Sequence, residues 1–175
     1  MAKTNLVLIG MPAAGKSTVG RLLADRFRCP FIDTDEVIES NHRKRLYQII
    51  EERGLPGFRK AEEEALLTLD VHDTVIATGG SVIYGDAGMR ALREQGVVVF
   101  LNTPLAVLSE RVGDPTARGM VIGPGQTFPE LYAQRLPLYR RYADIEIAAG
   151  DEPPAVVAER VRAALTERSS HQPAS

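Results

Sequence analysis

The chain has 175 residues, which fits one domain built around a single hydrophobic core. It is 44% hydrophobic and 25% charged, as is ordinary for a soluble globular domain. The formal net charge of −2 argues against a broad basic surface for nucleic acid or an anionic membrane. The apolar run 6–9 is too short for a signal peptide, and no apolar stretch could span a bilayer. A cytoplasmic protein is therefore expected.

The first half of the chain alternates short apolar runs with helical periodicity. The single cysteine, Cys29, is interpreted as a half-buried small hydrophobe after a turn. Gly54 is expected to end a helix, and the acidic run 62–64 is interpreted as a solvent-facing helix surface. The expected elements, in chain order, are a strand at 5–9, a helix at 16–27, a strand at 31–33, and helices at 43–53 and 58–69.

The second half continues the alternation, so the fold class is predicted to be α/β, a three-layer sandwich around a five-stranded parallel sheet. Residues 1–168 are assigned to this one domain, and 169–175 to a disordered tail. Segment 113–128 holds four glycines and two prolines and is interpreted as a mobile lid. The remaining expected elements are a strand at 74–78, a helix at 88–95, a strand at 97–101, a helix capped by Thr103 and begun by Pro104, a helix at 128–140, a strand at 145–148 and a helix at 154–168.

The strongest motif is the segment 10–17, Gly-Met-Pro-Ala-Ala-Gly-Lys-Ser, which matches the phosphate loop G-x-x-x-x-G-K-[ST] between a strand and a helix. Its glycines let successive backbone N–H groups turn toward phosphate oxygens, and the following helix presents its positive end. The lysine would reach the β- and γ-phosphates, and the serine hydroxyl would bind Mg²⁺. ATP with Mg²⁺ is therefore the expected ligand, bound by Gly10, Ala13, Ala14, Gly15, Lys16, Ser17 and Thr18.

Two carboxylates, Asp33 and Asp35, close the second predicted strand. Residues two apart in an extended strand end point to the same side, so both are expected to face the phosphate site. Carboxylate and hydroxyl oxygens are the ligands that Mg²⁺ prefers. The alternative is that Asp35 simply caps the helix that follows. Switch GTPases share the phosphate loop, but their Asn-Lys-x-Asp guanine signature is absent from this sequence.

Four groups of residues, the first of which includes the end of the phosphate loop and the two carboxylates, form a pattern that resembles shikimate kinase, in the nucleoside-monophosphate-kinase-like group. The resemblance spans about residues 5–148 and implies a sheet of order 2-3-1-4-5. The segments that carry it are 15–24 with 31–35, Gly57-Phe58-Arg59 followed by Glu62, Ala77-Thr78-Gly79-Gly80, and Arg135-x-Pro-Leu-Tyr with Ala143-Asp144.

On the donor side, the resemblance implies that Lys16 and Arg118 stabilise the transferring phosphoryl group, Arg118 from the lid. It implies that Asp33 holds Mg²⁺ together with Ser17, mostly through water. Arg111 would lie against the adenine.

On the acceptor side, the resemblance implies that Asp35 binds the acceptor hydroxyl and acts as base or orienting group. Arg59 and Arg135 would clamp a carboxylate, a task that suits a guanidinium fork. Gly79 and Gly80 would line the acceptor site, with the Gly80 backbone N–H donating to the acceptor.

The sequence departs from the resembled family at several positions. Segment 12–14 reads Pro-Ala-Ala where the family usually has a Met-Gly-x run, and alanine is expected to fit only with a negative φ. Ser81 stands where the family usually has a third glycine, which adds a hydroxyl beside the acceptor. Gly119-Met120 follows Arg118 where the family usually has Pro-Leu-Leu. Segment 41–45 is unusually basic for the acceptor side.

The leading hypothesis is a kinase that phosphorylates shikimate, a small acceptor with hydroxyl and carboxylate groups. A sister kinase for a sugar acid, or for a hydroxy amino acid such as homoserine, remains an alternative. A nucleotide kinase is disfavoured because the basic monophosphate-binding insert is not evident. A non-catalytic ATP-binding module needs no acceptor clamp and is disfavoured too. We expect neither a nucleic acid nor a membrane as partner, and we expect the protein to be a monomer.

Overall fold

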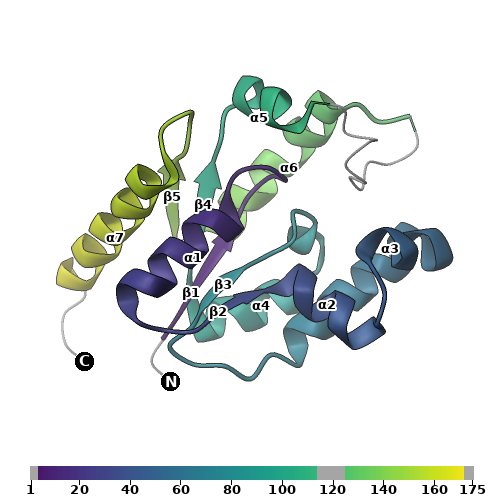
Figure 1. Cartoon of the computed structure of the whole chain (residues 1–175), viewed down its shortest axis with the longest axis horizontal. Coiled ribbons are helices and arrows are strands. Elements are labelled where there is room, and N and C mark those ends of the chain that lie inside the picture. Colours follow the sequence, from purple (N-terminus) through teal and green to yellow (C-terminus); the bar gives the residue numbers. More distant parts are fainter. Residues whose placement is uncertain (1–3, 114–124, 172–175) are drawn as a thin grey trace.

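The computed structural model describes residues 4–113 and 125–171. Its centre is a sheet of five strands whose neighbours all pair in parallel, in the order β2-β3-β1-β4-β5 (Figure 1). The predicted class, strand number and order are confirmed. The strands are β1 (Asn5–Ile9), β2 (Phe31–Asp33), β3 (Val75–Ala77), β4 (Gly96–Asn102) and β5 (Ile145–Ala148).

Helices cover both faces of the sheet, which makes the three layers that the sequence predicts (Figure 1). Helices α1 and α7 pack together on one face, whereas α4 and α6 lie on the other. Helices α2 and α3 extend beyond the β2 edge. The bounds are α1 (Lys16–Phe27), α2 (Thr34–His42), α3 (Leu46–Leu67), a 3₁₀ turn at Val82–Tyr84, α4 (Asp86–Gln95), α5 (Leu105–Val112), α6 (Phe128–Tyr142) and α7 (Pro154–His171).

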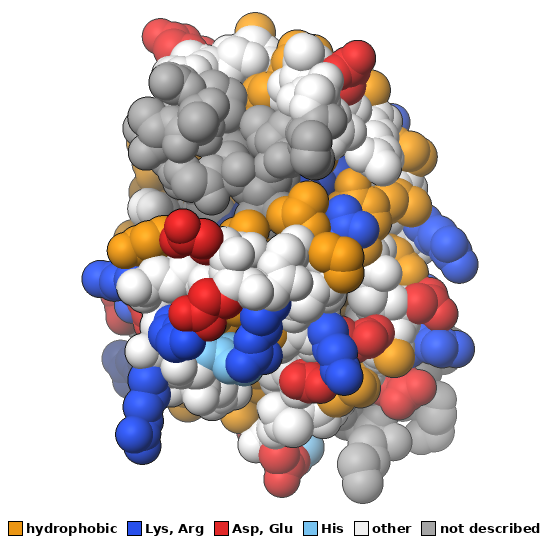
Figure 2. All heavy atoms as spheres, turned by 90° about the vertical axis from the view of Figure 1, so that its right-hand side faces the viewer, with side chains coloured by type: hydrophobic (Ala, Val, Ile, Leu, Met, Phe, Trp, Pro, Cys, Tyr) orange, Lys and Arg blue, Asp and Glu red, His pale blue; other side chains and the backbone are white. Residues whose placement is uncertain are grey.

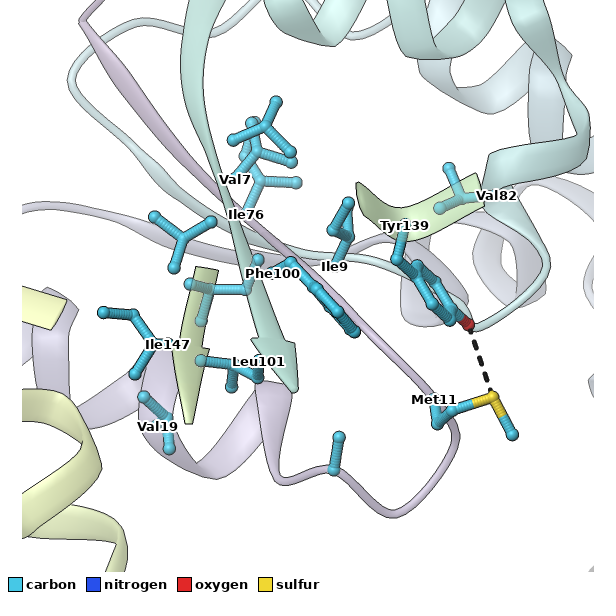
Figure 3. Close-up of a cluster of buried hydrophobic side chains, with 14 of the residues drawn as sticks. Val7, Ile9, Met11, Val19, Ile76, Val82, Phe100, Leu101, Tyr139 and Ile147 are labelled. Atoms are coloured by element: carbon cyan, nitrogen blue, oxygen red, sulfur yellow. Dashed lines mark hydrogen bonds between the residues drawn. The ribbon is translucent and has the colours of Figure 1, made fainter. Parts of the chain in front are cut away.

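The core lies between the sheet and its helices, and the central strands β1 and β4 are almost completely buried. Burial on both faces explains why these strands read as continuous apolar runs. Figure 3 shows Tyr139 of α6 beside Phe100 of β4, with their rings stacked at a centroid distance of 5.0 Å. The Tyr139 hydroxyl donates to the Gly80 carbonyl over 2.6 Å and lies 3.9 Å from the Met11 sulfur. Tyr139 thus joins the phosphate loop, at Met11, to the segment that follows β3, at Gly80.

Three element boundaries differ from the sequence prediction or refine it. Gly54 interrupts α3 with φ 66° and ψ 178°, as expected for the end of its first part. Helix α5 begins at Leu105 with Pro104 as its N-cap, and the buried Thr103 hydroxyl has no hydrogen-bond partner in the described structure. The predicted Thr103 cap is therefore wrong, because the helix starts one residue later than expected. Helix α7 continues to His171, into the segment expected to be disordered.

The expected lid lies largely outside the described residues, which omit 114–124. Arg118, Gly119 and Met120 belong to that omitted segment. On its far side, Thr127 caps α6 by accepting from the Glu130 amide, and Glu130 bonds back to the Thr127 amide. Over 4–113 and 125–171, no helix has both the length and the apolar character needed to cross a bilayer.

The basic segment 41–45 lies on the side of the molecule formed by α2 and α3. Figure 2 shows acidic and basic side chains interspersed on this face. Lys44 pairs with Glu52 over 2.6 Å, and Arg45 pairs with Glu39 over 2.9 Å. The positive charges of this segment are therefore largely offset by their neighbours.

Candidate active site

The phosphate loop joins β1 to α1 with positive φ angles at Gly10 (150°), Ala13 (65°) and Gly15 (89°). A Cβ on Gly10 would lie 2.8 Å from the Leu101 carbonyl oxygen, so this turn has room only for glycine. The expectation that alanine sits in this loop with negative φ is wrong at Ala13. The left-handed conformation costs an L-residue roughly 1–2 kcal/mol, so the loop holds Ala13 under backbone strain.

Lys16 is the buried cation of the loop. Its ammonium group donates to the Gly10 carbonyl over 2.9 Å and to the Met11 carbonyl over 2.8 Å. Burial lowers its pKa to about 8, and the nearby Asp35 and Asp33 oppose that shift. The side chain thus remains mainly charged at neutral pH. Two carbonyls of the phosphate loop hold it in place.

Asp33 connects the phosphate loop to α2. Its Oδ2 accepts a 2.6 Å hydrogen bond from the Ser17 hydroxyl, and its Oδ1 accepts from the Asp35 amide over 3.1 Å. Asp33 is therefore the N-cap of α2, and the alternative that Asp35 is the cap is wrong. The strand-alternation argument for the pair is wrong as well, because Thr34 already begins the helix.

The Ser17 and Asp33 side chains fit Mg²⁺ because they bring two hard oxygen donors together beside the phosphate loop. Among the described residues there is no group of three or more acidic, histidine or cysteine side chains that could hold a metal alone. Such a site would depend on phosphate oxygens and water for its other ligands, which is how Mg²⁺ binds in phosphoryl-transfer enzymes.

A cavity of about 390 Å³ opens beside the loop, and we call it the phosphate-loop cavity. It is lined from the loop, from α2 and α3, from the end of β3 and from α6. Asp35 lies on its wall, and the Asp35 Oδ1 atom is buried without a hydrogen-bond partner in the described structure. Of the predicted site residues, the cavity brings together Ala13, Gly15, Lys16, Ser17, Thr18, Asp35, Gly79, Gly80 and Arg135.

The charge state of Asp35 follows from this environment. Burial raises the pKa of Asp35 to about 6; Asp33 raises it further, whereas Lys16 lowers it. A carboxylate with an unpartnered oxygen and a raised pKa can accept a proton from a ligand at neutral pH. Asp35 is thus suited to the role of base or orienting group that the resemblance implies.

The two predicted clamp arginines converge on one ring. The Arg59 guanidinium lies 4.1 Å from the centroid of Tyr84, and that of Arg135 lies 5.4 Å from it. Arg135 is only 2% exposed, and its Nε has no hydrogen-bond partner in the described structure. Neither arginine forms an ion pair with a described carboxylate. A buried guanidinium without an anion creates a strong local preference for one.

A second cavity, of about 610 Å³, lies between the phosphate loop and the start of α7, and we call it the α7 cavity. Arg111 of α5 lines it and spans its two sides, since it donates to the Ala13 carbonyl over 3.3 Å and to the Gly150 carbonyl over 2.5 Å. Ala14, Gly15 and Thr18 line it as well. Arg111, for which a contact with adenine is predicted, therefore lies beside the phosphate loop although it is distant from it in the sequence.

Two side chains of this region, Glu62 and Tyr84, were missed from the sequence as site residues, whereas Ser81 was expected beside the acceptor. Glu62 is only 5% exposed, so the solvent-facing interpretation of the acidic run is wrong for it. The cause is its place on the inner side of α3, where its carboxylate accepts a hydrogen bond from the buried Ser81 hydroxyl. Burial raises the pKa of Glu62 to about 7. The Tyr84 ring completes the set, because it supports both arginines.

Comparison with known proteins gives one consistent result. The family model described as shikimate kinase matches residues 12–166. A shikimate kinase of Pseudomonas fluorescens is 38% identical over 156 residues, which cover 87% of this chain and 91% of the relative. A shikimate kinase of Saccharopolyspora erythraea is 40% identical over 168 residues, 94% of this chain and 95% of the relative.

The solved structure of a shikimate kinase from Acinetobacter baumannii in complex with shikimate superposes with a TM-score of 0.86 at 32% identity. The match covers 94% of each chain. Sequence relatives, family model and fold therefore agree, and the phosphate loop, the acidic pair and the buried Arg135 occur together in one region. This chain belongs to the shikimate kinase family, whose members are phosphotransferases that act on a hydroxyl group.

Proposed function

We propose that this protein transfers the γ-phosphoryl group of ATP to a ring hydroxyl of shikimate, giving shikimate 3-phosphate. The observation that carries the proposal is the buried Arg135, which has no anionic partner among the described residues and lines the same cavity as Lys16 and Asp35. One cavity thus offers a positive group for a carboxylate, a base for a hydroxyl and a phosphate-binding lysine. Membership in the family supports shikimate as the ligand that combines these needs.

The donor half of the proposal uses the phosphate loop. ATP would place its phosphates on the loop amides near Lys16 and Thr18, with the adenine in the α7 cavity against Arg111. When bound, Mg²⁺ would be held by Ser17 and Asp33 and would neutralise charge on the phosphates. The Lys16 ammonium, already fixed by two carbonyls, would stabilise negative charge on the transferring group without reorganisation.

The acceptor half uses the opposite wall of the phosphate-loop cavity. Arg59 and Arg135 would bind the carboxylate, and the Gly80 amide would donate to the ligand. This orients the ring so that its hydroxyl faces the unpartnered Asp35 Oδ1. Asp35 would then accept or orient the hydroxyl proton as the oxygen attacks the γ-phosphorus. Phosphoryl transfer has a loose transition state, so positioning and charge stabilisation account for most of the rate.

Two parts of the proposal rest on the sequence alone. Arg118 would contact the transferring phosphoryl group, and the segment 113–128 would close to exclude water. We also propose that the protein acts as a monomer in the cytoplasm, without a nucleic acid or membrane partner.

A coupled assay of ADP release tests the function across a panel of acceptors, with shikimate, quinate, gluconate and homoserine as probes. We expect shikimate-dependent ADP release at least tenfold above the rate without acceptor, and Mg²⁺ dependence of that rate. Turnover of another acceptor but not of shikimate would overturn the proposed acceptor. ADP release that no acceptor increases would overturn the transferase assignment.

A further inference from the structure

Ser81 and Glu62 form a buried hydrogen-bonded pair on the wall of the phosphate-loop cavity. The Ser81 hydroxyl donates to Glu62 Oε2, and both side chains are only 5% exposed. Within the described residues this is the one hydrogen bond of the Glu62 side chain, and Glu62 has no ion pair there. A buried carboxylate is therefore held by a hydroxyl rather than by a cation.

This arrangement requires an explanation because cations are near. Arg59 and Arg135 both act electrostatically on Glu62, and Arg135 lines the same cavity. Arg135 is buried, whereas Arg59 is exposed. The desolvated Glu62 carboxylate and the desolvated Arg135 guanidinium attract each other strongly, so an ion pair between them would be favourable. Such a pair would occupy a guanidinium group that the proposed function assigns to the acceptor.

The Glu62 carboxyl group lies against Gly79 and Ser81. A Cβ added to Gly79 would lie 2.7 Å from Glu62 Oε1 and 2.8 Å from Asp35 Oδ1, so the Glu62 carboxyl rests against the Gly79 backbone next to Asp35. Ser81 holds the other oxygen. A glycine at position 81, which the family usually has, would offer no hydroxyl and would leave that oxygen free to turn.

We propose that Ser81 is a specificity-determining residue of this site, because its hydroxyl holds the Glu62 carboxylate off Arg59 and Arg135 and keeps both guanidinium groups available for the acceptor's carboxylate. The proposal rests on the proposed function for its choice of acceptor. Ser81 acts through Glu62, so it is a positioning residue and not a catalytic one. Both guanidinium groups lie over the Tyr84 ring and not against Glu62, which agrees with this role of Ser81.

The experiment compares Ser81→Ala, Glu62→Gln and the double variant Ser81→Ala/Glu62→Gln with the wild-type protein. In Ser81→Ala we expect the KM for shikimate to rise about tenfold, the scale of one charge-assisted hydrogen bond, with kcat and the KM for ATP changed less than about twofold. The double variant should restore the KM for shikimate, because a neutral amide does not compete for the guanidinium groups. Glu62→Gln alone gives the KM for shikimate without the Glu62 charge and is the reference against which the double variant is compared.

An unchanged KM in Ser81→Ala, a fall in kcat instead, or a double variant no better than Ser81→Ala would overturn the proposal. A crystal structure of Ser81→Ala without acceptor gives a readout that does not depend on turnover. It should place a Glu62 oxygen within about 4 Å of Arg59 or Arg135; a Glu62 side chain left in its present position would overturn the proposal even if shikimate proved not to be the acceptor. A wild-type protein that does not phosphorylate shikimate would overturn the proposed function instead.

Discussion

The Ser17 hydroxyl donates a 2.6 Å hydrogen bond to Oδ2 of Asp33, which ties the first turn of α1 to the N-terminus of α2. Because Oδ1 of the same carboxylate caps α2 at the Asp35 amide, one side chain both supports a helix and faces the phosphate loop. The structural role and the proposed metal role of Asp33 can therefore be separated by choosing substitutions that remove only one of them.

Asp33→Asn should keep the helix cap, since asparagine caps as well as aspartate, whereas Asp33→Ala should lower the free energy of unfolding by about 1 kcal/mol. Both should raise the Mg²⁺ concentration needed for half-maximal transfer by about 10- to 100-fold, the effect usual for residues that support a metal. Chemical denaturation and Mg²⁺ titration of ADP release measure the two quantities. An Asp33→Asn variant with wild-type Mg²⁺ dependence would contradict the metal role.

Lys16→Met should lower kcat by about 100-fold or more, because it removes a preorganised positive charge from the transferring phosphoryl group. Lys60→Met is the matched control: Lys60 is exposed, and its 3.8 Å pair with Glu64 on α3 contributes little. Steady-state kinetics of both variants should show loss of transfer only for Lys16. Equal activity of the two variants would show that the loop does not act on phosphate.

Ala13→Gly should raise the free energy of unfolding by up to about 1 kcal/mol. Relief of left-handed strain at φ 65°, about 1–2 kcal/mol, exceeds the entropy that glycine adds to the unfolded chain, about 0.4–1 kcal/mol. Gly15→Ala is the converse test, because a Cβ there would contact nothing within 4 Å. Its loss of stability, up to about 1 kcal/mol, would report backbone strain less the entropy that alanine removes from the unfolded chain. Both are measured by denaturant unfolding without nucleotide.

The strain at Ala13 illustrates what the sequence could and could not predict. The phosphate loop and the parallel sheet followed from a motif and from apolar periodicity, which are local signals, whereas the strand order was implied by the resemblance to shikimate kinases. The sign of φ at Ala13 did not, because the loop is closed by distant contacts: Arg111 bonds its carbonyl, and the neighbouring Ala14 is buried in the core. Tertiary contacts hold Ala13 in a conformation that its own preference disfavours.

Glu62 shows the same limit at the acceptor wall. It stands in an acidic run on a helix, and such runs usually face solvent. Its neighbour Glu63 caps α4 by accepting from the Ala87 amide over 3.1 Å, and Glu64 is exposed, so three adjacent glutamates have three environments. Only the packing of α3 against α4 and the 3₁₀ turn separates them. The resemblance of Phe58-Arg59 followed by Glu62 to a family motif was the one signal in the sequence that Glu62 belongs to the site.

Glu62→Gln should change how stability depends on pH. In the folded state burial raises the pKa of Glu62 from 4.5 to about 7, so the folded protein binds more protons than the unfolded chain between these values. Stability from this group is therefore full below pH 4.5 and is lost as the pH rises toward 7. At most about 1.4 kcal/mol is lost for each pH unit.

Urea denaturation of both proteins from pH 4.5 to 8 measures this effect. Glu62→Gln should be more stable than the wild type at pH 8, by at most about 3 kcal/mol, and should lose less stability between pH 4.5 and 7. Asp35 still titrates in the variant and sets its remaining slope. A variant with the wild-type slope would show that Glu62 is ionised at acidic pH in the folded protein.

Arg135→Met should separate stability from acceptor binding. Arg135 is 2% exposed with no ion pair to a described carboxylate, so a methionine of similar volume should leave the free energy of unfolding unchanged or raise it by about 1–2 kcal/mol. The KM for shikimate should rise about 100-fold or more, because a buried carboxylate would lose its charged partner, while the KM for ATP stays within about twofold.

The matched control is Arg141→Met on the same helix, where the guanidinium is exposed and lies 5.4 Å from the Tyr142 ring centroid. It should leave both KM values unchanged. Shikimate should also raise the melting temperature of the wild type and of Arg141→Met but not of Arg135→Met, because a ligand stabilises only the protein that binds it. An Arg135→Met protein that lost affinity for ATP while keeping the shikimate-dependent shift in melting temperature would place the carboxylate elsewhere.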